Sequence, residues 1–126
     1  MLLALFLAFA GAGPAAAADG FNARVQAAKA LEQKPDGKAW QAKLWDTIGN
    51  PATDALKGCI ASNAPADKRA FSLVAKVDGQ GRSTEVAVSP ATPVANCFAG
   101  QFANWALPMP PKAPAPYPIE IDVSMD

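Results

Sequence analysis

The chain has 126 residues, of which 11 are basic and 11 acidic, so its formal net charge is zero, and it contains no histidine. The basic residues are scattered, and without a basic patch the electrostatic attraction that dominates nucleic-acid affinity is missing. The absence of histidine removes the commonest general base and a frequent metal ligand. We therefore expect no nucleic-acid partner, no metal, no cofactor and no enzymatic activity.

The first 18 residues have the layout of a secretory signal peptide. An apolar run at residues 2–10 is followed by Gly and Pro, and three alanines at residues 16–18 form a small-x-small cleavage site before Asp19. We expect export to the periplasm of a Gram-negative bacterium, with cleavage after Ala18. A retained membrane anchor is the alternative, although a spanning helix needs about 20 strongly apolar residues. Cleavage would leave 108 residues, the size of one small domain.

Cys59 and Cys97 are the only cysteines and lie 38 positions apart. In an exported chain, two cysteines predict one intramolecular disulfide. A metal site would need further ligands at short spacing, and a redox pair would need a C-x-x-C motif; neither is present. Two buried free thiols remain the alternative for a chain that stays in a reducing compartment.

Three helices are predicted in the first half of the chain. Asn22 can cap a helix that runs to about residue 33, and the Pro- and Gly-containing segment 34–38 predicts a turn. A second helix covers residues 38–48. Asn50 and Pro51 have the residue types of a helix cap and first helical position, so a third helix is expected from there to about Asn63. This pattern divides the mature chain into a helical segment, residues 19–49, and a domain, residues 50–126.

The pattern then changes to period two, which predicts a β-hairpin at residues 71–89. The residues expected on its buried face are Phe71, Leu73, Ala75, Val77, Thr84, Val86 and Val88. Thr92 and Pro93 predict the start of a further helix that ends before Pro108. The segment 108–118 contains too many prolines for a helix or a central strand and should form an extended crossing.

The last segment alternates again and predicts a third strand. Tyr117, Ile119, Ile121, Val123 and Met125 share the face expected toward the core, whereas Glu120 and Asp122 are expected to face water, where they could pair with Lys76. The predicted fold is α+β, with two helices packed on a three-stranded antiparallel sheet in the order α-β-β-α-β, preceded by extra N-terminal helices. Cys59 and Cys97 would join the two helices that flank the hairpin.

The elements "VDGQGRSTEVAVSP", "NCFAGQFANWALPMPP" and "YPIEIDV" occur in an order and spacing that resemble the C-terminal domain of TonB-type energy transducers. Related two-cysteine domains occur in periplasmic and gliding-motility proteins. The resemblance covers about residues 52–123 and implies that the last strand lies at a sheet edge, where partner peptides can add as a further strand. The chain lacks the long Pro-rich spacer that such transducers place before this domain, so energy transduction is not implied.

These observations favour a periplasmic, non-enzymatic binding or adaptor module that acts by strand addition. The expected contact residues are Tyr117, Ile119, Glu120, Ile121, Asp122 and Val123. One alternative is an inhibitor or immunity-type protein that acts against a cell-envelope hydrolase. Another is an accessory subunit of an envelope complex, with Trp40 and Trp45 as its docking surface. The carboxylate pairs Asp46–Asp54 and Glu120–Asp122 are better explained by caps and solvent-facing strand positions than by glycoside hydrolysis.

Overall fold

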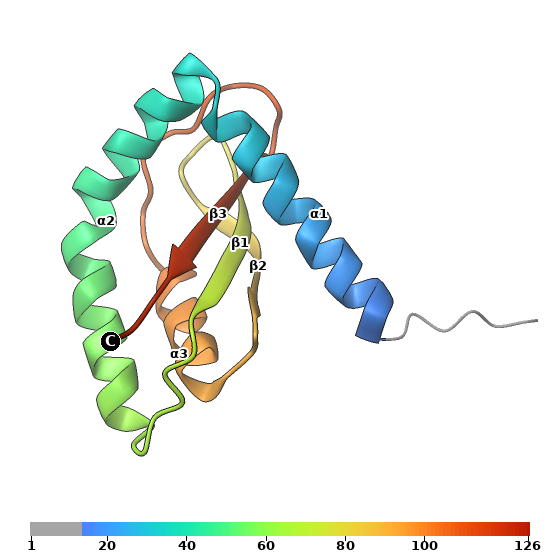
Figure 1. Cartoon of the computed structure of the whole chain (residues 1–126). Helices are drawn as coiled ribbons and strands as arrows, with labels where there is room; N and C mark the ends of the chain where they lie inside the picture. The colour runs from blue at the N-terminus through green and yellow to red at the C-terminus, as the bar shows by residue number, and fades with distance from the viewer. Residues whose placement is uncertain (1–13) are drawn as a thin grey trace, which may run out of the picture.

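The computed structural model describes residues 14–126, with side chains from residue 20 onward. Residues 1–13, which hold most of the expected signal peptide, lie outside the described part. The elements in chain order are α1 (Pro14–Glu32), α2 (Pro35–Ser62), β1 (Phe71–Val77), β2 (Ser83–Ser89), α3 (Pro93–Phe102) and β3 (Tyr117–Val123). Figure 1 shows α1 and α2 on either side of a sheet, with α3 packed at its lower end.

The three strands form one antiparallel sheet in the order β2-β1-β3, so β1 is central. Leu73 of β1 lies opposite Val88 of β2 and Ile121 of β3, which places all three on the same face. This face is the inner face of the sheet and holds the core together with α2 and α3. The buried core residues are Trp40, Leu44, Ile48, Phe71, Leu73, Ala75, Val77, Ala95, Phe98, Phe102, Leu107, Tyr117, Ile119 and Ile121. The predicted α+β fold is confirmed.

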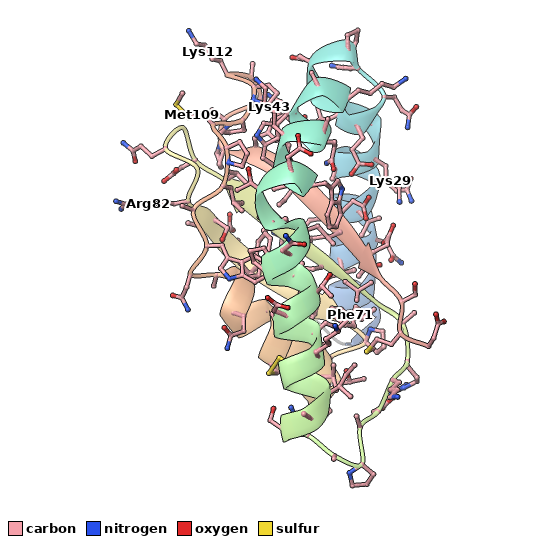
Figure 2. The ribbon with its side chains drawn as sticks, turned by 90° about the vertical axis from the view of Figure 1, so that its left-hand side faces the viewer. Lys29, Lys43, Phe71, Arg82, Met109 and Lys112 are labelled. Carbon is pink, nitrogen blue, oxygen red and sulfur yellow. A yellow bond between two sulfur atoms is a disulfide. The ribbon has the colours of Figure 1, made fainter. Side chains whose placement is uncertain are left out.

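The outer face of the sheet is covered by α1. The turned view in Figure 2 shows α2 in front of the sheet and α1 behind it. Lys29 of α1 contacts Glu120 and Asp122, whose side chains lie on the face opposite to Ile119 and Ile121. Ala28 of α1 is buried. The expectation that this face of β3 meets water is therefore wrong where α1 crosses it, and Glu120 is only 6% exposed.

The helix break predicted at residues 49–51 is also wrong, because α2 continues through Pro51. Pro51 lacks the N–H that would donate to the carbonyl one turn earlier. The apolar stripe of α2 nevertheless continues across it at four-residue spacing, with Leu44, Ile48, Ala52 and Leu56 all packed in or against the core. Burial of this stripe against the sheet and α3 outweighs the local cost of the proline. The boundary proposed between residues 49 and 50 falls inside this helix.

The N-terminal ends of both long helices also differ from the prediction. Pro35 occupies a first-turn position of α2, where its fixed φ suits the helix, so the segment 34–38 mostly forms the start of α2. The N–H of Gly37 donates to Asp36 Oδ1 at 2.9 Å in this first turn. Only residues 33 and 34 separate the two helices. α1 begins at Pro14, so Asn22 lies inside it and is not a cap.

A bulge in β2 changes the predicted hairpin pattern. Val74 pairs with Ala87 and Lys76 with Thr84, so β2 contains one residue more than β1 between these pairs. Glu85, which lies in this interval, has a φ of 51°. Because of this extra residue, the β2 residues before the bulge point to the faces opposite to those that regular alternation would give. Thr84 therefore lies opposite Lys76 on the outer face, and Ser83 lies on the inner face. The prediction that Thr84 faces the core is wrong.

The predicted start of α3 is confirmed, because Thr92 Oγ1 accepts a 3.1 Å hydrogen bond from the N–H of Ala95. Cys97 of α3 is joined to Cys59 of α2 by a disulfide, as the sequence predicted. α3 ends at Phe102, earlier than expected, and residues 103–116 form neither helix nor strand. This return segment is fixed at its start, where Leu107 donates a 2.9 Å backbone hydrogen bond to Gly81.

Candidate functional site

β3 lies at one edge of the sheet, and its unpaired backbone groups can be assigned. In an antiparallel strand, successive residues point their N–H and C=O groups alternately to the two sides. Asp78 donates its N–H to the carbonyl of Arg82 on the β2 side at 2.9 Å, so Lys76, two residues earlier, also points toward β2. Its partner on β3, Pro118, therefore points away from β1, which suits a residue without an N–H. The other β3 residues with outward backbone groups are Glu120 and Asp122.

The side of β3 that faces away from β1 is buried near the start of the strand and exposed to solvent near its end. Glu120 is only 6% exposed, whereas the Asp122 side chain is 57% exposed. Ser124 and Asp126, which follow the strand, are also exposed. Of the six residues predicted to bind a partner, Tyr117, Ile119, Glu120 and Ile121 are buried, and the surface is reduced to Asp122, half-buried Val123 and the residues after them. Residues 122–126 form the open edge of the sheet.

A groove of about 400 Å³ lies between the open edge and α2. Its wall on α2 contains Trp45, Ile48, Ala52 and Leu56, and its wall on β3 contains Val123 and Asp122. Of the two tryptophans predicted to form a docking surface, Trp45 is 45% exposed, whereas Trp40 is 3% exposed and belongs to the core. Ala52 and Leu56 were not predicted to line a surface groove, although they continue the four-residue stripe that contains Leu44 and Ile48.

The opposite edge of the sheet, formed by β2, is less suited to pairing. The bulge at Glu85 interrupts its ladder, and Arg24 Nη2 of α1 donates a 2.6 Å hydrogen bond to the carbonyl of Glu85. Bulges and covering side chains are common devices that prevent an edge strand from pairing with another chain. Among the described residues, the open edge of β3 is therefore the better surface for strand addition.

Three charged residues connect α1 to β3 beside the open edge. Lys29 Nζ lies 3.1 Å from Asp122 Oδ2 and 3.3 Å from Glu120 Oε1. Lys76, which the sequence placed opposite the acidic face of β3, instead pairs with Glu85 at 3.2 Å. Burial and the nearby Glu32 carboxylate raise the pKa of Glu120 to about 7.

The pKa of the neighbouring Asp122 carboxyl group is shifted in the opposite direction, downward. The hydroxyl of Ser72 donates a 2.7 Å hydrogen bond to Asp122 Oδ1, and this contact, together with Lys29, lowers the pKa of Asp122. The hydrogen bond to Asp122 is also the main cause of the raised pKa of Lys29. Asp122 and Lys29 thus remain charged near neutral pH, whereas Glu120 can exchange a proton there.

The described residues contain no cluster of three or more Asp, Glu, Cys or His side chains arranged to hold a metal ion. Both cysteines are committed to the disulfide, so neither is a free nucleophile. The groove beside this disulfide, about 470 Å³ between α2 and α3, is lined by Asp54, Gln101 and Trp105 among others. None of the helices described from residue 14 onward combines the length and the apolar content that a bilayer-spanning segment requires.

Comparison with known proteins found no matching family model, no matching curated protein and no matching solved structure.

Proposed function

We propose that this protein is a non-enzymatic binding module of the bacterial periplasm that adds an extended segment of a partner protein to the open edge of β3. The observation that supports this most directly is the unpaired N–H and C=O of Asp122, exposed at a sheet edge and bordered by an apolar groove. In strand addition the backbone bonds provide affinity, and pockets beside the strand select side chains. The disulfide suits an oxidising compartment, which agrees with export through the N-terminal segment.

The charges at this site favour a basic partner segment. Asp122 is the only charged residue that lines the groove, and Asp126 follows it at the exposed end of the chain. Two copies of this chain that paired through their open edges would bring these carboxylates together, which disfavours self-association. A segment with an apolar side chain for the groove and Lys or Arg beside Asp122 complements the surface. The relationship to TonB-type C-terminal domains is proposed on the same grounds, since those domains also use their last strand as an edge.

The test is a pair of substitutions at one position. Asp122→Pro removes the outward N–H but leaves the ladder with β1 intact, since Pro118 already occupies an equivalent position in β3. Asp122→Ala is the matched control, because it removes the same carboxylate and keeps the N–H. Mature protein carrying each change is used to capture partners from an envelope extract, and the captured proteins are quantified by mass spectrometry.

We expect a set of partners that Asp122→Ala captures less well than wild type, because the carboxylate is lost, and that Asp122→Pro captures at least tenfold less than Asp122→Ala. Synthetic peptides from those partners should then bind the mature protein with the same dependence. Equal capture by all three proteins would contradict strand addition at this edge. Capture of a cell-envelope hydrolase that is inhibited equally by all three would instead support the inhibitor alternative.

A further inference from the structure

α1 closes the part of the β3 edge that the partner segment would otherwise reach. The backbone groups of Glu120 point outward like those of Asp122, yet Glu120 is buried. Lys29 and Glu32, both in the last turns of α1, lie beside the Glu120 side chain. Lys29 forms an ion pair with it, and the negative charge of Glu32 raises its pKa. Without α1, the outward carbonyl of Pro118 and the outward N–H and carbonyl of Glu120 would extend the open edge toward the start of β3.

α1 is attached to the rest of the molecule through few fully buried apolar residues. Among its residues with described side chains, only Ala28 is buried. Its polar contacts with the sheet are the Lys29 ion pairs and the hydrogen bond from Arg24 to the carbonyl of Glu85, and half-buried Leu31 in its last turn packs against the core. A segment with few buried apolar contacts belongs to the low-stability end of a structure and can open without global unfolding. In Figure 1, α1 runs along one side of the sheet, and its C-terminal end continues into α2.

We propose that α1 is a removable strap whose docking on the sheet is coupled to protonation of Glu120, so that release of α1 on ionisation of Glu120 lengthens the binding edge of β3. The inference deepens the proposed function, since it concerns regulation of the same edge. The group concerned is the buried carboxyl of Glu120, which lies beside the carboxyl groups of Glu32 and Asp122. Oε1 contacts Lys29, while Oε2 is buried and has no hydrogen-bond partner among the described residues.

Every charged group that faces Glu120 contributes to this balance. α1 supplies Lys29, which favours the ionised form, and Glu32, which opposes it. The amide of Gln41 on α2 is uncharged and donates to Glu32 Oε1 at 3.5 Å. On β3, Asp122 adds a second negative charge. On the adjacent strand β1, Lys76 is directed to Glu85. Two neighbouring carboxylates and burial thus outweigh the single lysine.

The direction of the pH effect follows from linkage. Glu120 holds its proton up to about pH 7 when α1 is docked, and its ordinary pKa of 4.5 returns when α1 leaves and water reaches the carboxyl group. The docked state therefore binds the proton more tightly, so docking is favoured below pH 4.5 and is weakened as the pH rises through 7. Between pH 5.5 and 8.5 the docking equilibrium constant should fall about 30-fold. The chain has no histidine that would add its own titration in this range.

Amide hydrogen exchange of the mature protein, with its disulfide intact, tests the inference without any ligand. Exchange is measured at pH 5.5, 7.0 and 8.5 and corrected for the intrinsic rate at each pH. Protection of the amides in residues 21–32 and of the Glu120 amide should fall about 30-fold over this range. Protection of Leu73 and Ala75 in the central strand should stay higher throughout, because their exchange requires global opening.

Two variants distinguish the effect of Glu120 protonation from other effects of pH on α1. Glu120→Gln keeps a neutral side chain of the same size, and its α1 protection should stay nearly constant with pH. Asp122→Asn is the matched control: it should still show a fall in protection, smaller than in wild type because one of the carboxylates that oppose ionisation of Glu120 is lost, and its overall α1 protection should be lower.

An equal pH response in Glu120→Gln, or α1 amides that exchange only as fast as Leu73, would overturn the inference. Because no partner enters this measurement, it can fail while the capture experiment succeeds, and the reverse also holds.

Discussion

The indole N–H of Trp40 in α2 donates a 3.1 Å hydrogen bond to the carbonyl of Pro108, 68 residues later in the chain. The same indole contacts the Tyr117 ring edge-on, with ring centroids 5.5 Å apart. Trp40 therefore fixes both ends of the proline-containing segment that leads from α3 to the edge strand. The position of β3, and with it the groove against α2, depends on this residue.

Trp40→Phe should lower the free energy of unfolding by about 2 kcal/mol. The change keeps an aromatic ring but leaves the Pro108 carbonyl without its donor and reduces the packed volume. Urea denaturation of the mature protein measures the difference. Trp45→Phe is the control: Trp45 is 45% exposed, so less than about 0.5 kcal/mol is expected. Equal effects of the two substitutions would mean that Trp40 does not hold this segment.

Removal of the disulfide by the double change Cys59→Ala and Cys97→Ala should lower the free energy of unfolding by about 3–4 kcal/mol. The crosslink closes a segment of 38 residues and restricts the unfolded chain accordingly. The same loss should follow when wild type is unfolded in the presence of a reducing agent. Thiol labelling of denatured, unreduced protein from its native host should find no free cysteine, and two labelled thiols would disprove the crosslink.

Gly81→Ala should destabilise the protein by about 2–3 kcal/mol. Gly81 has a φ of 80°, and an added Cβ would lie 2.0 Å from the carbonyl oxygen of Leu107. The clash would also break the hydrogen bond from Leu107 to Gly81. Gly79→Ala, in the same turn, meets no atom within 4 Å and should change stability by less than about 1 kcal/mol. Thermal unfolding followed by circular dichroism distinguishes the two variants.

Ser83→Ala should stabilise the protein by about 1 kcal/mol. The bulge turns Ser83 to the inner face, where its hydroxyl is buried without a hydrogen-bond partner among the described residues. Thr84→Ala, on the outer face, should be close to neutral. The regular alternation of the sequence would predict the opposite order, with the larger effect at Thr84. Chemical denaturation of both variants therefore tests the register of the hairpin.

Local chemistry was enough to predict the secondary elements from Phe71 onward. The period-two pattern identifies three strands, and Thr92 followed by Pro93 marks the start of α3, because these signals act over a few residues. The disulfide followed from the even cysteine count and the export signal. At Pro51 the local sequence predicted the start of a new helix, but α2 continues through this residue. Burial of the apolar stripe of α2 outweighs the one backbone hydrogen bond that the proline cannot make.

The proposed binding surface was only partly determined by the sequence. The alternation of residues 117–123 identifies the strand and its two faces, and the topology β2-β1-β3 places it at an edge. Nothing in that pattern shows that α1 crosses the outer face, buries Glu120 and leaves only residues 122–126 open. Nor does it show that Trp45 and Leu56 of α2 border the open edge. Patterns along the chain report which side of an element is apolar, whereas the partner that covers each side is decided by packing between segments distant in sequence.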